Sequence, residues 1–366
     1  MVSAWARTRA RERIAALGAA GLTDRELRRE VLAVLRGVMD FRAHVWLLTD
    51  PVTTVGVSPL AEVPCITELP ALIRAKYATP VNRWTTLARQ DSPAGRLTGT
   101  AGGEPTRGGA WREMLSRYGI GDVASAVFAD QYGCWGFLDL WQDGSYHADD
   151  TGFLASLAAP LASALRQCQA RTFSGPAAAH RRDAGPVVLT LDDDLRILGR
   201  TAASQAWLNV LLPPEPGEQA IPASVYNVAA QLLAAEEGID DHQPCARVHL
   251  ADGFWLTLRA ARLASAGRTP ASPGRTPASP GRASIVVTIE EASAADRLDL
   301  FSRAFGLTGR EHELLSLLAT GHDTRAMARQ MSLSEHTVQD HLKSIFTKTG
   351  ARDRVTILSR ALGTAQ

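Results

Sequence analysis

SEHTVQDHLKSIFTK, residues 334–348, predicts an α-helix with one apolar face and one polar face. Ser334 is a good N-cap, because its side-chain oxygen can accept a hydrogen bond from a free N–H of the first turn. Mostly apolar side chains recur at helical spacing and form a stripe that we expect to be buried: Val338, Leu342, Ile345, Phe346 and Thr349. The opposite face carries Gln339, Asp340 and Lys343, whose amide, carboxylate and amine groups are of the kinds that read base edges in a DNA major groove.

Three further short helices are predicted around this one. Thr308 and Glu311 have the spacing of a capping box that opens the first helix. Asp323 can cap a second helix over residues 324–331, and Asp353 can cap a fourth. We expect the fourth helix to turn these apolar residues inward: Val355, Ile357 and Leu358. Short helices in this order, with a tight turn before the third, predict a helix-turn-helix unit.

Residues 307–358 resemble the LuxR-type (GerE-like) DNA-binding domain. The matching residues are Leu307, Thr308, Arg310, Glu311, Leu315, Gly321, Ala328, Ser334, Thr337, Val338, His341, Leu342, Ile345, Lys348, Gly350 and Arg354. The resemblance implies that the third helix enters the major groove, with base-reading positions at Gln339, Asp340 and Lys343. The chain departs from the family at Gly309, where Pro is common, and at Gln339, where a basic residue is common.

Contacts to the DNA backbone are expected from Ser334, Thr337, Lys348 and Arg352. Phosphate contacts position a protein on the duplex but do not specify sequence. Residues 303–360 contain nine Lys and Arg against six Asp and Glu, a net charge of +3 with His neutral, whereas the whole chain is only +1. The positive excess is therefore local to the C-terminal domain, which we place at residues 300–363.

The length of 366 residues predicts two or three domains, and a hydrophobic content of 45% predicts globular cores. No run of eighteen apolar residues occurs, and no apolar segment follows the basic N-terminus, so we expect neither a membrane span nor a signal peptide. The four cysteines lack metal-ligand spacing, which favours reduced thiols and a cytoplasmic location: Cys65, Cys134, Cys168 and Cys245.

Residues 20–170 are predicted to form an α+β domain. Thr23 and Glu26 make a capping box that opens a helix over residues 24–39. Strands are predicted at 43–48, 123–128 and 134–141, and a helix at 153–171 closes the domain. This order resembles a GAF sensor domain, with the likeness carried from Trp135-Gly136 through the closing helix.

Residues 184–292 are predicted to form a second α+β domain. Strands flank an acidic turn within residues 187–198, a helix follows at 202–211, and later strands are expected at 253–260 and 284–289. This order resembles a PAS-like domain. A heptapeptide repeat rich in Pro, Gly and Ser lies between the last two strands, and we expect residues 266–283 to be a disordered insertion.

Three features of these two domains have competing interpretations. Asp192, Asp193 and Asp194 suggest a phosphoacceptor, but the other residues of a receiver domain do not follow in order, which favours an acidic turn. Cys134 beside Trp135 is either a redox site or an inert core thiol. Five tryptophans either fill cores or line an apolar ligand pocket: Trp46, Trp84, Trp111, Trp135 and Trp141.

These patterns predict a cytoplasmic transcription regulator and not an enzyme. We expect no metal or cofactor, since the sequence has no Lys-ended phosphate loop, metal-ligand cluster or activated nucleophile. The expected partners are double-stranded DNA with a palindromic operator, RNA polymerase, a second copy of the chain, and an unknown small-molecule or protein signal. The expected dimer surfaces are the helices at 24–39, 153–171 and 355–362. A signalling adaptor whose C-terminal domain binds protein is the alternative.

Overall fold

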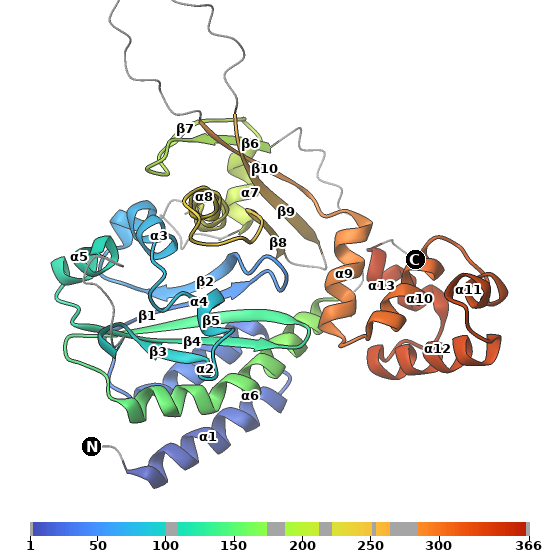
Figure 1. Cartoon of the computed structure of the whole chain (residues 1–366), viewed down its shortest axis with the longest axis horizontal. Helices are drawn as coiled ribbons and strands as arrows, with labels where there is room; N and C mark the ends of the chain where they lie inside the picture. The colour runs from blue at the N-terminus through green and yellow to red at the C-terminus, as the bar shows by residue number, and fades with distance from the viewer. Residues whose placement is uncertain are drawn as a thin grey trace, which may run out of the picture.

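The computed structural model describes residues 3–99, 109–173, 187–211, 222–250, 254–263 and 284–363. Two antiparallel five-stranded sheets with their helices form the body, and a helical C-terminal domain projects from one side of it (Figure 1). This agrees with the α+β N-terminal part and the all-α C-terminal domain expected from the sequence. The predicted insertion at 266–283 lies outside the described residues.

The first sheet has the strand order β2-β1-β5-β4-β3, with antiparallel pairing throughout. Its strands are β1 (Ala43–Thr49), β2 (Gly56–Glu62), β3 (Ala94–Arg96), β4 (Asp122–Asp130) and β5 (Gly133–Gln142). The strands predicted at 43–48, 123–128 and 134–141 are confirmed as β1, β4 and β5. The sequence does not predict β2, because Pro59 interrupts its pattern. Proline is tolerated there since β2 is an edge strand.

Helices α2 (Asp24–Arg36) and α6 (Ala148–Thr172) cover one face of the first sheet, and α1 (Ala4–Ala19) packs against these two helices (Figure 1). The capping box of Thr23 and Glu26 is present as expected. The apolar faces of α2 and α6 are buried in the core of this domain. A dimer contact through these helices would therefore use their exposed outer faces, and the dimer surfaces expected at 24–39 and 153–171 remain predictions. Helix α1 extends the domain to the N-terminal side of its predicted start.

Short elements cover the opposite face of the first sheet: η1 (Ile66–Glu68), α3 (Leu69–Tyr77), α4 (Trp84–Leu87), η2 (Leu97–Gly99) and α5 (Gly109–Arg117). All five tryptophans singled out in the sequence are buried in this domain. Trp46 and Trp135 belong to the core beneath α2 and α6, and the ring of Trp84 stacks on that of Phe137 at 4.3 Å. Trp111 and Trp141 line a cavity of about 190 Å³, and Trp135 lines a smaller one of about 50 Å³. All five tryptophans belong to hydrophobic clusters, so the set mainly fills cores.

The second sheet has the strand order β7-β6-β10-β9-β8. Its strands are β6 (Val187–Leu191), β7 (Ile197–Arg200), β8 (Cys245–His249), β9 (Trp255–Arg262) and β10 (Ile285–Glu291), and its helices are α7 (Ser204–Leu211) and α8 (Ala223–Glu236). Numbered along the chain within each sheet, both orders read 2-1-5-4-3. The residues at 192–194 form a turn between β6 and β7, which agrees with the acidic-turn interpretation.

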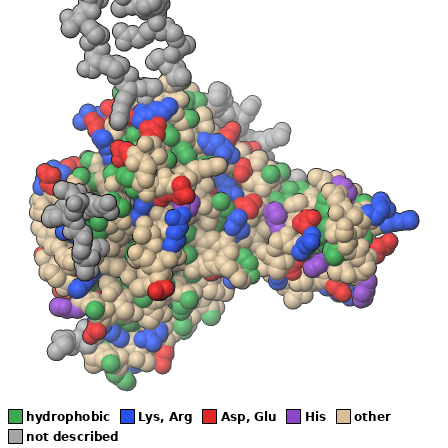
Figure 2. Space-filling model, in the orientation of Figure 1, with side chains coloured by type: hydrophobic (Ala, Val, Ile, Leu, Met, Phe, Trp, Pro, Cys, Tyr) green, Lys and Arg blue, Asp and Glu red, His purple; other side chains and the backbone are tan. Residues whose placement is uncertain are grey.

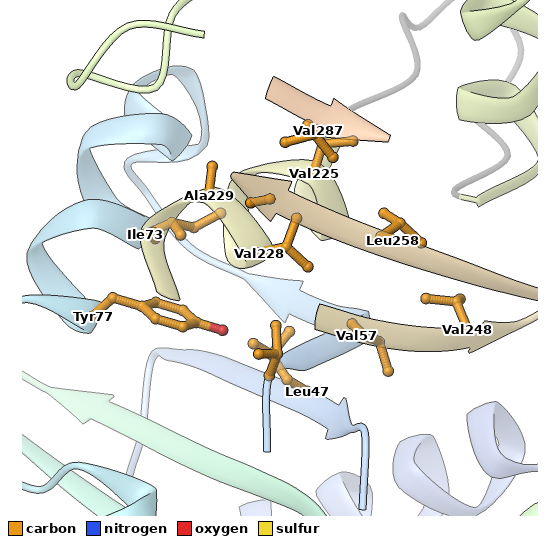
Figure 3. Packing of buried hydrophobic residues seen from close by; sticks show 14 of the residues in the cluster. Leu47, Val57, Ile73, Tyr77, Val225, Val228, Ala229, Val248, Leu258 and Val287 are labelled. Atoms are coloured by element: carbon orange, nitrogen blue, oxygen red, sulfur yellow. The ribbon is translucent and has the colours of Figure 1, made fainter. Parts of the chain in front are cut away.

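Helix α8 lies between the two sheets and joins their cores. It packs against β2 and α3 of the first domain and against β9 and β10 of its own sheet. Ten of its 14 residues are buried, because apolar side chains occur on nearly all its sides. Figure 3 shows Leu47 and Val57 of the first sheet facing the same cluster as Val228 of α8 and Leu258 of the second sheet. The two sheets therefore share one hydrophobic core.

Two buried ion pairs reinforce this contact. Arg247 on β8 donates two hydrogen bonds to Asp50, which follows β1: Nε to Oδ2 at 2.7 Å and Nη2 to Oδ1 at 2.9 Å. Burial by itself raises the pKa of the Asp50 carboxyl, but the hydrogen bonds and charge of Arg247 outweigh burial and lower that pKa. The second pair joins Arg83 Nε to Asp240 Oδ2 at 2.7 Å.

Helix α9 (Ala294–Ala304) connects this body to the C-terminal helices α10 (Gly309–Ala319), α11 (Thr324–Met331), α12 (Glu335–Thr349) and α13 (Arg354–Leu362). Arg247 also donates to Asp299 of α9 at 2.9 Å, so it contacts both sheet domains and the connecting helix. Arg303 donates to the carbonyl of Tyr132 at 2.9 Å. Within the described ranges, no helix is both long and apolar enough to span a membrane.

Arg247→Ala should destabilise the whole body, because Asp50 would remain buried without its counter-charge. We expect a loss of about 3–5 kcal/mol in the free energy of unfolding, measured by urea unfolding followed by circular dichroism. Arg259→Ala on the neighbouring strand is the matched control, since that side chain is 47% exposed and its pair with Glu290 spans 3.5 Å. Its expected cost is below about 1 kcal/mol. Equal losses in the two variants would contradict the role given to Arg247.

Candidate nucleic-acid interface

The four C-terminal helices begin where their capping residues predict. Thr308 and Glu311 form the expected capping box of α10, and Asp323 accepts from the N–H of Ala326 to open α11. Ser334 and Asp353 cap α12 and α13 in the same way. Local hydrogen bonds thus set the boundaries of all four helices.

A tight turn fixes the angle between α11 and α12. Ser332 takes the left-handed conformation with φ of 55°, which ends α11. The N–H of Leu333 then bonds the carbonyl of Ala328 at 2.9 Å, and Ser334 starts the next helix. This is the helix-turn-helix arrangement predicted from the sequence.

Helix α12 divides into an inner and an outer face as expected. Val338, Leu342 and Ile345 are at most 2% exposed and belong to the core of the C-terminal domain. Phe346 is half-buried and packs against that core, and Thr349 is buried. The predicted base-reading residues Gln339, Asp340 and Lys343 are all exposed.

Side chains on the outer face have intradomain partners that the sequence does not reveal. Gln339 Nε2 lies 3.4 Å from Thr324 Oγ1 on α11, and Arg354 Nη2 donates to the same oxygen at 2.8 Å. Asp340 lies 3.6 Å from the ammonium of Lys343. The outer face of α12 therefore carries the exposed, oppositely charged Asp340 and Lys343, beside the Gln339 amide that contacts α11.

Glu311 and Lys348 form an ion pair behind the exposed face. The Lys348 ammonium lies 2.7 Å from Glu311 Oε2 and donates to the carbonyl of Gly306 at 3.2 Å. Ser344 donates to the other oxygen of Glu311 at 2.6 Å. Burial alone raises the pKa of the Glu311 carboxyl, but Lys348, Ser344 and Thr308 outweigh it and lower that pKa to about 2. One carboxylate therefore caps α10 and holds α12 against it.

The four residues expected to contact the DNA backbone have different surroundings. Arg352 is exposed. Ser334 and Thr337 bond each other at the start of α12, with their hydroxyl oxygens 2.9 Å apart. Lys348 pairs with Glu311, so a phosphate would have to share the Lys348 ammonium with that carboxylate. Two further exposed arginines, Arg325 and Arg329, lie on α11 of this domain. The pattern of the recognition helix does not point to them, because they precede that helix in the sequence.

Val355 does not face inward as the sequence pattern predicts. Its side chain is 69% exposed, whereas Ile357 is buried and Leu358 is half-buried. The helix starts at Arg354, so Val355 falls in the first turn, on the side away from the core. An apolar side chain is therefore left in solvent on α13.

The visible surface of the C-terminal domain mixes Lys and Arg with Asp, Glu and His side chains (Figure 2). It does not present a uniformly basic face in this view. On this face, attraction to phosphate would therefore depend on individual cations rather than on a broad positive field.

Few described residues could hold a metal or act as a reactive thiol. Asp240, Asp241 and His242 bring ligand atoms within 4.8 Å of one another, but the guanidinium of Arg83 already occupies one side of Asp240. The thiol of Cys134 is buried and free, and burial raises its pKa to about 11, which favours the interpretation as a core residue.

Comparison with known proteins places the similarity in the C-terminal domain. Residues 306–361 match the family model for bacterial regulatory proteins of the luxR family. The transcriptional regulatory protein DesR of Bacillus subtilis is 35% identical over 63 residues, 17% of this chain and 32% of DesR. The probable regulator GfsR of Streptomyces halstedii is 38% identical over 71 residues, 19% of this chain and 29% of GfsR. The chain thus spans about a third of the length of these relatives.

Solved structures add a distant similarity. VqmA of Vibrio cholera, in a complex with ligand and DNA, is 17% identical. The match covers 50% of this chain and 86% of that chain, with a TM-score of 0.20. The chain therefore carries a luxR-type helix-turn-helix domain at 306–361, on the strength of the family model and the transcription regulators that share it.

Glu311→Gln should destabilise the C-terminal domain at neutral pH by on the order of 3 kcal/mol, from about 1.4 kcal/mol per unit of pKa shift. The pKa of Glu311 is lowered in the folded chain, so its stabilisation is present above the unfolded value of about 4.3 and is lost as the pH falls toward 2. The difference between wild type and variant should shrink over that interval. Amide hydrogen exchange in α10 and α12 of the full chain measures it.

Glu313→Gln is the matched control, because Glu313 is 44% exposed and pairs only with the exposed Arg310 among the described residues. Its exchange rates should follow those of wild type at every pH. A Glu311→Gln effect that stays constant from neutral to acidic pH would show that the carboxylate charge is not what stabilises the domain.

Proposed function

We propose that this protein is a sequence-specific, DNA-binding transcription regulator whose N-terminal half receives the signal. The observation that carries the proposal is the division of α12 into a packed inner stripe and an exposed outer face with Gln339, Asp340 and Lys343. The match of residues 306–361 to the luxR family supports it independently. In this arrangement α12 enters the major groove and its outer face reads bases.

Affinity comes mainly from contacts beside the reading face. Asp340 offsets the charge of Lys343, so this face has little net attraction for phosphate. Arg352, together with the hydroxyls of Ser334 and Thr337, contacts the DNA backbone at the two ends of α12. Lys348 joins them only by sharing its ammonium between a phosphate and Glu311.

The two sheet domains are proposed to be GAF-like and PAS-like sensors, acting in the cytoplasm where the chain meets DNA. The common strand order 2-1-5-4-3 supports treating them as two versions of one architecture. A small-molecule or protein signal shifts an equilibrium between two presentations of the C-terminal domain. The contacts of Arg247 with both sheet domains and with α9 provide the connection.

The chain is proposed to bind a palindromic operator as a homodimer, with RNA polymerase as a further partner. One recognition helix contacts too few base pairs for useful selectivity, whereas two related by a two-fold axis reach half-sites about one DNA turn apart. The dimer contact is proposed to lie within residues 355–362, where the side chain of Val355 is 69% exposed and accessible to a partner. A buried partner surface would remove this apolar side chain from water.

Gln339→Ala should weaken binding to the preferred operator by roughly 1–3 kcal/mol and relax the base preference, since a Gln amide suits adenine. The operator is first selected from fragments of the source genome, and binding is measured by electrophoretic mobility shift. Gln330→Ala, an exposed change on α11, is the matched control and should leave the preference intact. Unchanged selectivity in Gln339→Ala would remove Gln339 from the reading set.

The same selection separates the regulator from its alternative. A signalling adaptor whose C-terminal domain binds protein would retain no genomic fragment at any salt concentration. The mixed charges of the visible face of this domain give that alternative its support (Figure 2). Salt-sensitive retention of a defined sequence excludes it.

Arg352→Ala should weaken binding to all sequences alike and lower the salt dependence by about one counter-ion, as loss of a phosphate contact does.

Lys348→Met tests whether the Lys348 ammonium contacts phosphate or serves only as the partner of Glu311. If Lys348 contacts phosphate, the salt dependence falls in the same way. If it serves only Glu311, the melting temperature falls and the salt dependence does not change, and Lys348 then leaves the backbone-contact set.

A further inference from the structure

A cavity of about 190 Å³ lies between the first sheet and the helices α3, α5 and α8. It reaches across the boundary between the two sheet domains, because Ala223 and Asn227 of α8 line it together with residues of β1, β2 and β5. Ile66 also lines the cavity and is 45% exposed, so the cavity reaches solvent near η1. A cavity of roughly 150 Å³ is enough to bind benzene, so this one accommodates a single substituted ring.

The walls favour an aromatic occupant. Trp111 and Trp141 meet edge to face, with ring centroids 5.7 Å apart, and Phe137 lies on the same lining. Tyr77 is a further aromatic lining residue, and most of the others are aliphatic, apart from Lys76, Asp139 and Asn227. Flat rings pack against such aromatic side chains in stacked or edge-to-face geometries, which adds to the apolar area that binding buries.

A buried ion pair gives the cavity a polar end. Lys76 Nζ lies 2.7 Å from Asp139 Oδ2, and the two side chains are 8% and 2% exposed. Ser125 donates to the other carboxylate oxygen at 2.6 Å, so Asp139 is well supplied with donors. Among the described residues, Asp139 is the only ion-pair partner of Lys76, and the Lys76 ammonium also lies 5.2 Å and 6.0 Å from the ring centroids of Trp111 and Phe137. An acceptor on a ligand would therefore approach the ammonium beside these rings. A buried ion pair often adds little net stability to a fold, so stabilisation alone is a weak explanation for this one.

Two more polar atoms on the lining residues lack partners. Within the described part of the chain, Asn227 Oδ1 and Trp141 Nε1 are buried and make no hydrogen bond. Asn227 is 1% exposed, and its Nδ2 donates to the carbonyl of Gly56 at 2.8 Å, which holds the amide in place. Buried polar groups are normally satisfied, so an unmatched acceptor and donor on one cavity point to a ligand that offers the complementary groups.

We propose that this cavity binds an uncharged, single-ring aromatic molecule that carries both a hydrogen-bond donor and an acceptor. Its acceptor meets Lys76 or Trp141 Nε1, and its donor meets Asn227 Oδ1. The ligand is uncharged because Lys76 and Asp139 already cancel, and a carboxylate would be buried beside Asp139 without a counter-ion. The proposal names the class of signal for the regulator and rests on that function only for its effect on DNA.

Para-fluorobenzamide, which has both groups on one ring, is the probe. Fluorine NMR of the free probe, titrated with the full chain in the absence of DNA, measures its dissociation constant. Para-fluorotoluene and para-fluorobenzoate test the polar and the charge requirement. We expect the amide to bind more tightly than either by at least about tenfold, the value of one well-made hydrogen bond. Failure of the amide to bind, or equal binding of all three, overturns the proposal.

Ala61→Phe tests the location. Ala61 is exposed and lines the cavity, so a phenyl ring there fills its open side at little cost in packing. Ala261→Phe, also at an exposed strand position but on β9, is the matched control. Affinity for the amide should fall by at least about tenfold in the first variant, the loss expected when a packed ring is displaced, and stay unchanged in the second. Equal affinity in both variants would place the probe elsewhere.

The double variant Lys76→Met with Asp139→Asn tests the polar end without leaving a buried charge alone. Circular dichroism melting first shows that the variant is folded. The ratio of the dissociation constant of para-fluorotoluene to that of para-fluorobenzamide should then fall toward one. A preference that persists in the folded variant removes the ion pair from the site. Because all these titrations omit DNA, they fail or succeed independently of mobility-shift tests of the proposed regulator.

Discussion

The guanidinium of Arg247 is the interaction on which the arrangement of the chain depends. It forms a two-pronged contact with Asp50 of the first domain, while its own strand belongs to the second, and another of its nitrogens bonds Asp299 on the helix that leads to the C-terminal domain. A planar group with donors in a fixed fork suits such a junction, because it can satisfy two carboxylates in different directions. Because this junction is buried, water cannot replace its hydrogen bonds, and the two sheet domains and α9 keep one relative arrangement.

Helix α8 supplies the apolar counterpart of that junction. Its side chains pack against both sheets, and they belong to the one hydrophobic cluster that joins the two domains. Small residues such as Ala229 and Ala230 allow both sheets to approach closely. Asn227 interrupts this apolar surface, and the same residue lines the cavity. The helix that unites the domains is therefore also the element that a bound molecule would touch.

The elements that the sequence predicts correctly are those whose signals are local. Thr308, Asp323 and Ser334 cap helices through bonds to residues only three positions away, and alternating apolar residues mark most of the strands. Helix α8 has no comparable signal, because it is buried on nearly all sides and has no broad polar face to reveal its period. The contacts of Gln339 with α11 and of Lys348 with α10 also escape prediction, since they depend on how helices pack.

The C-terminal domain projects from the body and is joined to it at the base of α9 (Figure 1). Arg166 bonds the last carbonyl of that helix at 3.2 Å, and Arg303 bonds back to Tyr132. The ring of Phe173, at the end of α6, contacts the rings of Trp255 and Phe301, so polar bonds and an aromatic cluster together hold the base. The far end of the domain lies well beyond this junction (Figure 1). A rotation of α9 by a few degrees would therefore displace that far end more than the base, and in the proposed dimer it would change the spacing of the two C-terminal domains.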